Sequence, residues 1–279
     1  MSKLQTKAVI VKYKISCYGG EKSDKTESNN LAAFHNIEDV NNAGVRVVNK
    51  VLGRSHYLDA CKKYAAYIRS QIQNLGIIPY TKGSVIVSFN KLPEFKSKCI
   101  SMAQQYQAKV QDLVDNFDDI VENARRQKGS LLKEADIPSV DYVKSRFGFK
   151  MTVTPFPKAS NFEDLLDSEE EVAELKKELQ EDLNNISSEL NKHLLYTLEE
   201  RLEAIKNNVK SCKVKLKTQC VEASIKKAKY VKDRNVLDHS RVNYIADKII
   251  EIVNRPPESF ANDTVKETTI QEIDNLLGN

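Results

Sequence analysis

Apolar residues in the C-terminal half of the chain recur at every third or fourth position. The repeat runs through Val172, Leu175, Leu179, Leu183, Ile186, Leu190, Leu194, Leu198, Leu202, Ile205, Val209, Cys212 and Leu216. Its mean step is 3.67 residues (44 residues over 12 steps), which favours a straight or slightly right-handed packing stripe on a helix. Neither Gly nor Pro occurs between Pro157 and Pro256, so we expect a helical arm over residues 158–255. The arm is either one long helix or a helical hairpin with a turn at Asn184-Asn185 or Asn207-Asn208.

Alternating apolar and polar positions predict short strands in the first part of the chain. Residues 9–17 and 146–154 show the period of two that is typical of a half-buried strand. Residues 77–80 and 84–89 flank a Thr-Lys-Gly turn and predict a β-hairpin. Residues 45–52 lie between two glycines and are a further candidate strand.

Helical periodicity separates these strands. Apolar side chains spaced by three and four residues predict helices over residues 58–75 and 95–124, with Pro93 in the first turn of the second helix. The polar run at 19–30 is expected to be a loop. Residues 1–157 are therefore predicted to form an α+β head, in which two helices cover a small antiparallel sheet.

The C-terminal part of the chain is predicted to turn at residues 233–238 and to continue as an amphipathic helix up to Pro256. Residues 256–279 are expected to form a flexible tail that ends in a short amphipathic helix. The apolar positions of this helix, as a candidate partner-binding face, are Ile270, Ile273, Leu276 and Leu277. The predicted fold class is mainly α (α+β), with a small antiparallel sheet, packed helices and a long helical or coiled-coil arm.

Composition places the chain among globular proteins. Of the 279 residues, 41% are hydrophobic and 29% charged, and the net charge is only +4, so any basic patch has to be local. The five cysteines are scattered and odd in number, which favours reduced thiols in a cytoplasm over a disulfide framework. No apolar run approaches the roughly 18 residues of a membrane span, and we expect a cytoplasmic protein.

The sequence offers no constellation for catalysis or for a bound cofactor. Its four histidines are far apart, and Cys212 and Cys220 are too widely spaced for a zinc site. The Gly19-Gly20 pair that follows the first predicted strand lacks the spacing and the Gly-Lys-Ser order of a phosphate-binding loop. We therefore expect no catalytic residues, no metal and no cofactor, and the chain is predicted not to be an enzyme.

The charges of the arm are divided by sign. Residues 163–203 carry 14 acidic and 4 basic side chains. The following segment carries the basic residues Lys206, Lys210, Lys213, Lys215, Lys217, Lys226, Lys227, Lys229, Lys232 and Arg234. In a continuous helix, Lys206, Lys210, Lys213 and Lys217 would share one face. Such a stripe could pair with acidic residues of the same chain or of a second copy, follow a nucleic-acid backbone, or bind an acidic protein.

Three segments of the chain also carry a resemblance. The segments NAGVRVVNKVLG, KKYAAYIRSQIQNLGIIPYTKGSVIVSFNKLPEF and VKSRFGFKMTVTPFP, followed by a long helix, resemble an uncharacterised protein family of phages and conjugative elements. Genes of that family often neighbour those of a MoxR-type AAA+ ATPase and a von Willebrand A-domain protein, which implies an adaptor role. In its helical arm and small sheet the chain is more loosely similar to Gam nuclease inhibitors, which coat DNA ends.

These observations predict a non-enzymatic, homo-oligomeric binding protein of a phage or mobile element, located in the host cell cytoplasm if a phage encodes it. The first hypothesis is an adaptor or accessory factor for a protein machine such as a MoxR-type ATPase. The alternatives are a protein that binds DNA non-specifically or protects DNA ends, and a structural virion or scaffold protein.

Overall fold

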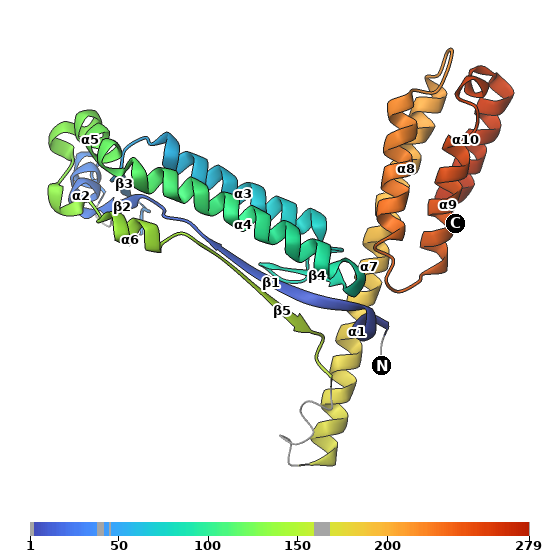
Figure 1. Ribbon diagram of the computed structural model, residues 1–279, viewed down its shortest axis with the longest axis horizontal. Helices are drawn as coiled ribbons and strands as arrows, with labels where there is room; N and C mark the ends of the chain where they lie inside the picture. Colours follow the sequence, from blue (N-terminus) through green and yellow to red (C-terminus); the bar gives the residue numbers. More distant parts are fainter. Residues whose placement is uncertain (1–2, 38–41, 45, 159–167, 279) are drawn as a thin grey trace. The chain divides into compact units, whose positions relative to one another are not determined.

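The computed structural model describes residues 3–37, 42–44, 46–158 and 168–278, and the chain forms two compact units. Unit 1 comprises Met1–Lys12, Leu75–Phe95 and Val153–Asn279, and unit 2 comprises Tyr13–Asn74 and Lys96–Thr152. The boundary that we placed at residue 157 coincides with neither unit, because three separate segments of the chain build unit 1. The mainly helical fold class with a small antiparallel sheet is confirmed (Figure 1).

The first elements include a two-stranded sheet that was not expected. They are α1 (Lys3–Lys7), β1 (Ala8–Ser16), β2 (Glu21–Asp24), α2 (Lys25–Phe34) and β3 (Val47–Lys50). Strands β2 and β3 pair antiparallel, with Glu21 opposite Lys50. The loop predicted at 19–30 is therefore wrong. Asp24 caps α2 by accepting a hydrogen bond from the Glu27 backbone N–H at 3.1 Å, and this local cap lies within a segment that looks merely polar.

Helices α3 (His56–Leu75) and α4 (Leu92–Asp115) lie side by side through most of unit 2 (Figure 1). The Tyr64 hydroxyl donates to Gln105 Oε1 at 2.6 Å, and the Cys61 thiol donates to the Lys109 carbonyl at 3.3 Å. The helix predicted over 95–124 is interrupted at Asn116, whose side chain donates to the Asp112 carbonyl. The remaining elements of this region are α5 (Phe117–Lys128), η2 (Gly129–Leu131), η3 (Glu134–Asp136) and α6 (Val140–Ser145).

A three-stranded sheet has the order β4-β1-β5, with β4 at Ser84–Ser88 and β5 at Gly148–Pro155. Strand β1 pairs antiparallel with β4, Ala8 lying opposite Ser88 and Lys12 opposite Ser84. The predicted hairpin is present in reduced form, because residues 77–80 bond to β4 without forming a regular strand: the Ile77 N–H donates to the Ile86 carbonyl at 2.7 Å. The short helix η1 (Phe89–Lys91) links β4 to α4.

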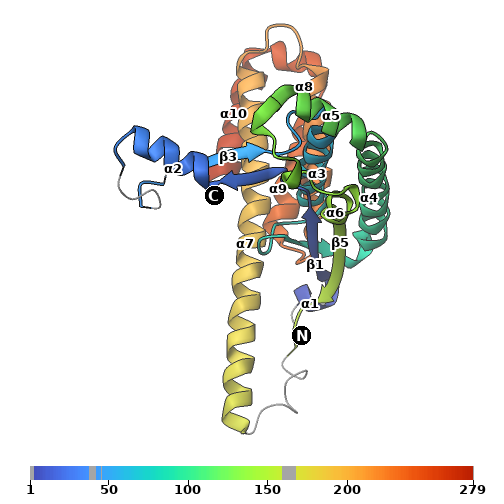
Figure 2. The same ribbon diagram turned by 90° about the vertical axis from the view of Figure 1, so that its left-hand side faces the viewer.

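The C-terminal part of unit 1 is a bundle of four helices, α7 (Glu169–Lys210), α8 (Thr218–Lys232), α9 (Ser240–Val253) and α10 (Asp263–Gly278), with η6 (Pro257–Ala261) before the last. The Ser168 side chain caps α7 by accepting a hydrogen bond from the Glu171 N–H. Three glutamates occupy the first turn, where their negative charges interact favourably with the positive end of the helix dipole. Both views show the first turns of α7 extending beyond the other three helices (Figures 1 and 2).

The apolar stripe of the arm forms the core of this bundle. Its fully buried members include Leu190, Leu198, Leu202 and Ile205, which belong to one cluster with apolar side chains of α8, α9 and α10. The arm is a set of antiparallel helices and not one continuous helix. Helix α7 passes through Asn184-Asn185 without a break and ends just after Asn207-Asn208, where Ser211 donates its hydroxyl to the Asn207 carbonyl. The predicted turn at 233–238 separates α8 from α9.

The expected flexible tail is also wrong. Helix α10 packs against α7, and Phe260 before it is fully buried. The Leu216 N–H donates to the Pro257 carbonyl at 2.9 Å, which joins the α7–α8 connection to η6. The segment carries enough apolar surface to complete the bundle, so it is part of the core.

Candidate binding surfaces

Seven lysines of the basic segment form what we call the lysine surface. Its members are Lys210, Lys213, Lys215, Lys217, Lys226, Lys227 and Lys229, and all are exposed. Among the described residues none of them has a carboxylate within 4.0 Å. Lys210 ends α7, Lys213 and Lys215 lie in the connection to α8, and Lys217 stands at the N-cap of α8.

The single helical stripe that we predicted is corrected by this placement. Lys206 and Lys210 lie on α7, but the helix ends at Lys210, so Lys213 and Lys217 share no helical face with them. The lysine surface instead consists of residues at the end of the bundle and of exposed positions of α8. Figure 1 shows the α7–α8 connection at the tip of the bundle. Val214, between two of the lysines, is 74% exposed at this tip.

The other three basic residues are engaged within unit 1. The Lys206 ammonium donates to the Asp274 carboxylate on α10, and this hydrogen-bonded ion pair raises the pKa of Lys206. Lys232 donates to Asp247 on α9 at 2.6 Å. Both acidic partners come from the last two helices, not from the acidic first half of the arm.

Arg234 is held by an aromatic ring and by backbone carbonyls. Its guanidinium lies 3.4 Å from the centroid of the Tyr230 ring and donates to the Gly76 carbonyl at 3.2 Å. Burial lowers the pKa of this guanidinium. The ammonium of Lys227 lies 5.1 Å from the centroid of the same ring. Tyr230, the one aromatic residue of the basic segment, is therefore occupied by intramolecular cation–π contacts.

The four apolar residues predicted to bind a partner are built into the bundle. Ile273 is fully buried and Leu276 is 8% exposed, while Ile270 and Leu277 are half-buried against the same core. Ion pairs hold the helix in place, including Arg255 to Glu272 at 2.7 Å. The prediction that Ile273 and Leu276 bind a partner is therefore wrong, because both side chains are buried in the core of the bundle.

Unit 2 carries an apolar cleft that sequence reasoning missed. The cleft has a volume of about 520 Å³ and lies beside α2 and the β2–β3 pair. Leu31, Val47, Val48 and Leu131 supply its apolar walls, and polar residues such as Glu27 and Lys133 also line it. Leu131 is 68% exposed, and Phe34, three residues after Leu31 on α2, is 80% exposed. The spacing of Leu31 and Phe34 was the available signal, but these two residues directly follow the predicted loop and no helix was predicted for them.

The ionisable side chains do not gather into a reactive centre in the described ranges. No group of three His, Cys, Asp or Glu side chains there could hold a metal ion. Burial raises the pKa of the Cys61 and Cys99 thiols to about 11, which disfavours the nucleophilic thiolate. His193 lies at the surface of α7 but is partly covered by its neighbours. This partial burial, and after it the positive charge of Lys227, lower the pKa of His193. The absence of enzymatic activity stays a prediction.

No helix in the described part of the chain is long and apolar enough to cross a membrane. Comparison with known proteins finds one family model, described as a protein of unknown function (DUF3150), which matches residues 6–233. Neither a curated protein nor a solved structure matches the chain. The matched range covers most of both units and ends after α8, so it includes the whole lysine surface.

Proposed function

The chain belongs to the DUF3150 family of proteins of unknown function, and we propose that this member is a non-enzymatic protein that binds duplex nucleic acid without sequence specificity. One observation carries the proposal: seven exposed lysines cover the end of the bundle and α8 with no carboxylate within ion-pair distance among the described residues. Uncompensated positive charge of this kind attracts a polyanion, and each phosphate contact releases counterions.

The residue types favour phosphates over an acidic protein surface. Lysine is depleted in protein–protein interfaces, which prefer arginine and exposed aromatic side chains. All seven members of the surface are lysines, which serve phosphates well as point charges. From Lys217 to Lys229 the surface extends about 18 Å along α8 at 1.5 Å per residue, a length of about five base pairs at 3.4 Å per pair.

The same surface is poorly suited to reading bases. Sequence-specific contacts favour arginine forks on guanine, and single strands favour open aromatic stacking platforms. Arg234 is bound to backbone carbonyls and covers the Tyr230 ring, so neither side chain is available for these contacts. Binding would therefore rest on the backbone of the duplex.

The test is a salt titration of binding to a fluorescent DNA duplex of arbitrary sequence. If all seven lysines contact phosphates, the slope of log K against log salt approaches roughly −6, from about −0.9 per contact. The triple variant Lys213→Glu/Lys215→Glu/Lys226→Glu should bind at least tenfold more weakly at low salt and with a shallower slope.

A matched control shows whether weaker binding comes from the loss of the lysine surface or only from the lower net charge of the protein. Lys96→Glu/Lys144→Glu/Lys150→Glu makes the same charge change at exposed positions of unit 2. It should retain most of the affinity. Equal loss in the two triple variants, or no loss in either, would reject the lysine surface as the binding site.

An adaptor role is the second candidate, and the apolar cleft of unit 2 favours it. Contiguous exposed apolar side chains mark protein-binding surfaces, and Leu31, Val48 and Leu131 gather around one cleft. The family resemblance suggests a phage or mobile-element setting with a MoxR-type AAA+ ATPase as the partner. The buried helix α10 no longer supports this role.

The adaptor candidate is tested by titrating a MoxR-type ATPase with the protein and with its Leu131→Asp variant. The matched control is Ile100→Asp, which changes an apolar residue on α4 that is 56% exposed, against 68% for Leu131. Weakened binding by Leu131→Asp alone supports the cleft, and unchanged binding by both variants contradicts it. Light scattering on the same samples tests the predicted homo-oligomer, and an oligomer that assembles without any partner would favour the scaffold alternative.

A further inference from the structure

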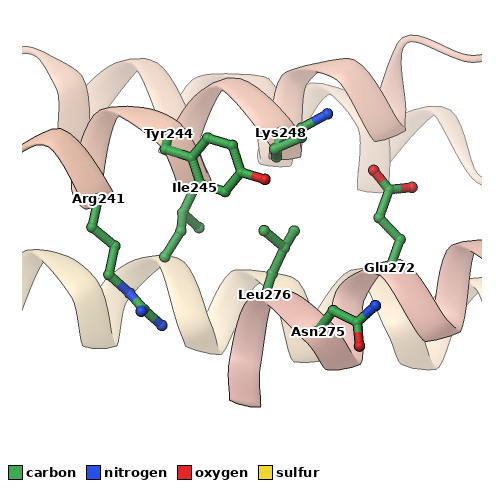
Figure 3. A pocket seen from close by; sticks show the side chains of 7 residues that line it. All are labelled: Arg241, Tyr244, Ile245, Lys248, Glu272, Asn275 and Leu276. Atoms are coloured by element: carbon green, nitrogen blue, oxygen red, sulfur yellow. The ribbon is translucent and has the colours of Figure 1, made fainter. Parts of the chain in front are cut away.

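A pocket of about 290 Å³ lies between α9 and α10 (Figure 3). Helix α9 contributes Arg241, Tyr244, Ile245 and Lys248, which share one face of the helix at intervals of three, one and three residues. Helix α10 contributes Glu272, Asn275 and Leu276 from the other side (Figure 3). The pocket is thus built from residues on two regular helices, and none of its lining belongs to a loop.

The floor of the pocket is apolar and fixed. Ile245 is 1% exposed and Leu276 is 8% exposed, and both belong to the core of the bundle. Tyr244 is more than half exposed, and its ring stands between Arg241 and Lys248 in Figure 3. A ligand in the pocket would therefore meet an apolar base and one aromatic wall.

The polar groups that remain available are donors. Among the described residues the Arg241 guanidinium has neither a carboxylate within 4.0 Å nor a hydrogen-bond acceptor. The Asn275 Oδ1 accepts from the Gln271 side chain at 3.3 Å, so the Asn275 amide presents its N–H groups. The Tyr244 hydroxyl is a third group that is able to donate.

The other charges at the pocket are already compensated. The Lys248 ammonium donates to Glu251 at 2.7 Å, and this hydrogen bond is the main reason why the pKa of Lys248 is raised. The Glu272 carboxylate accepts from Arg255 at 2.7 Å. Lys248 and Glu272 are thus each neutralised by a partner, and Arg241 is the one charged residue of the lining that has none among the described residues. A ligand with one negative charge is therefore complementary to the pocket.

We propose that this pocket binds a carboxylate attached to a short apolar chain. The Arg241 guanidinium would donate to both carboxylate oxygens, and Ile245, Leu276 and the Tyr244 ring would cover the chain. The guanidinium presents two parallel N–H donors, which match the planar, acceptor-only geometry of a carboxylate. The volume, just below the roughly 300 Å³ at which small-molecule pockets begin, suits a single acid of a few carbons or the last residue of a peptide. This site is independent of the lysine surface and of the apolar cleft.

Calorimetric titration with hexanoate tests the proposal directly, and hexanamide serves as the neutral isostere. Hexanoate should bind the wild-type chain in roughly the millimolar range, as expected for a ligand of about eight non-hydrogen atoms in an open pocket. Hexanamide should bind at least about tenfold more weakly, since it lacks the charge-assisted hydrogen bonds. A tripeptide ending in leucine, with a free or an amidated C-terminus, shows whether the site prefers a chain end to a free acid.

Arg241→Gln should weaken hexanoate binding about tenfold or more, while Arg126→Gln, which removes an exposed arginine from α5, should leave it unchanged. Asn275→Asp adds a negative charge to the lining of the pocket and should also weaken binding, which provides a second variant if Arg241→Gln does not fold. Equal affinity of Arg241→Gln and wild type would overturn the proposal. So would equal affinity for hexanoate and hexanamide, or no binding of any carboxylate probe by the wild type.

Discussion

Replacing Ile273 by alanine should destabilise unit 1 strongly, although the sequence places this residue near the end of the chain. Ile273 is fully buried in the cluster that α10 shares with α7, α8 and α9. The change removes three methyl or methylene groups at about 0.8 kcal/mol each, or about 2.4 kcal/mol. The residual cavity adds to this cost, and buried isoleucine-to-alanine changes typically lose 2–5 kcal/mol. We expect a loss of about 3 kcal/mol in the free energy of unfolding.

The assay is urea unfolding followed by circular dichroism at 222 nm, because the bundle holds much of the helix. Gln271→Ala is the matched control on the same helix, since Gln271 is exposed and only bonds the nearby Asn275 side chain. The control should change stability by no more than about 0.5 kcal/mol. If the Ile273→Ala variant is as stable as this control, the reasoning is refuted, and residues 256–279 would not be part of the core.

Three further predictions concern other contacts. Arg201→Ala should cost about 1–3 kcal/mol, measured by urea unfolding, because its guanidinium donates to Ser224 Oγ at 2.7 Å and to the Cys220 carbonyl at 2.8 Å; a cost below the error would contradict a structural role. Gly76→Ala should cost about 1–3 kcal/mol, since its Cβ would lie 2.8 Å from Val85 Cβ, whereas Gly19→Ala, with open space around it, should change the melting temperature little. The Cys61 and Cys99 thiols have pKa values raised to about 11 from an ordinary value near 9, so their contribution to stability is fully present below pH 9 and is lost as pH rises towards 11; a Cys61→Ala/Cys99→Ala variant should lose less stability over that range in urea titrations, and an equal loss would contradict the argument.

Periodicity alone predicts the helices that have one apolar face. The stripe from Leu183 to Val209 is buried as its spacing indicates, because a helix hides one face whatever its partners are. The same stripe continues in register to Leu216, which is also buried, although it lies in a non-helical connection. The end of α7 was therefore hidden, since burial in the connection mimics the helical repeat.

Partners distant in sequence account for the rest. Lys206 pairs with Asp274, 68 residues further along, and Arg234 reaches the Gly76 carbonyl across 158 residues. The charge pattern of the sequence identifies the ten basic residues. It does not indicate which three of them bind acidic side chains or backbone carbonyls of the same chain. Likewise, the apolar cleft depends on Leu131 joining Leu31 and Val48, which no local pattern predicts.

The division of unit 1 into three segments has a consequence for the order in which the protein is made. Every residue of unit 2 has been synthesised by Thr152, whereas unit 1 waits for α7–α10 before its bundle is complete. Helix α1 and the 75–95 segment therefore leave the ribosome long before the helices that bury Leu4 and Ile78. Domains fold as units in the order of synthesis, so we expect these apolar side chains to gain their helical partners only after α7–α10 have been made. We therefore expect the early segments of unit 1 to depend on nascent-chain chaperones more than the segments of unit 2 do.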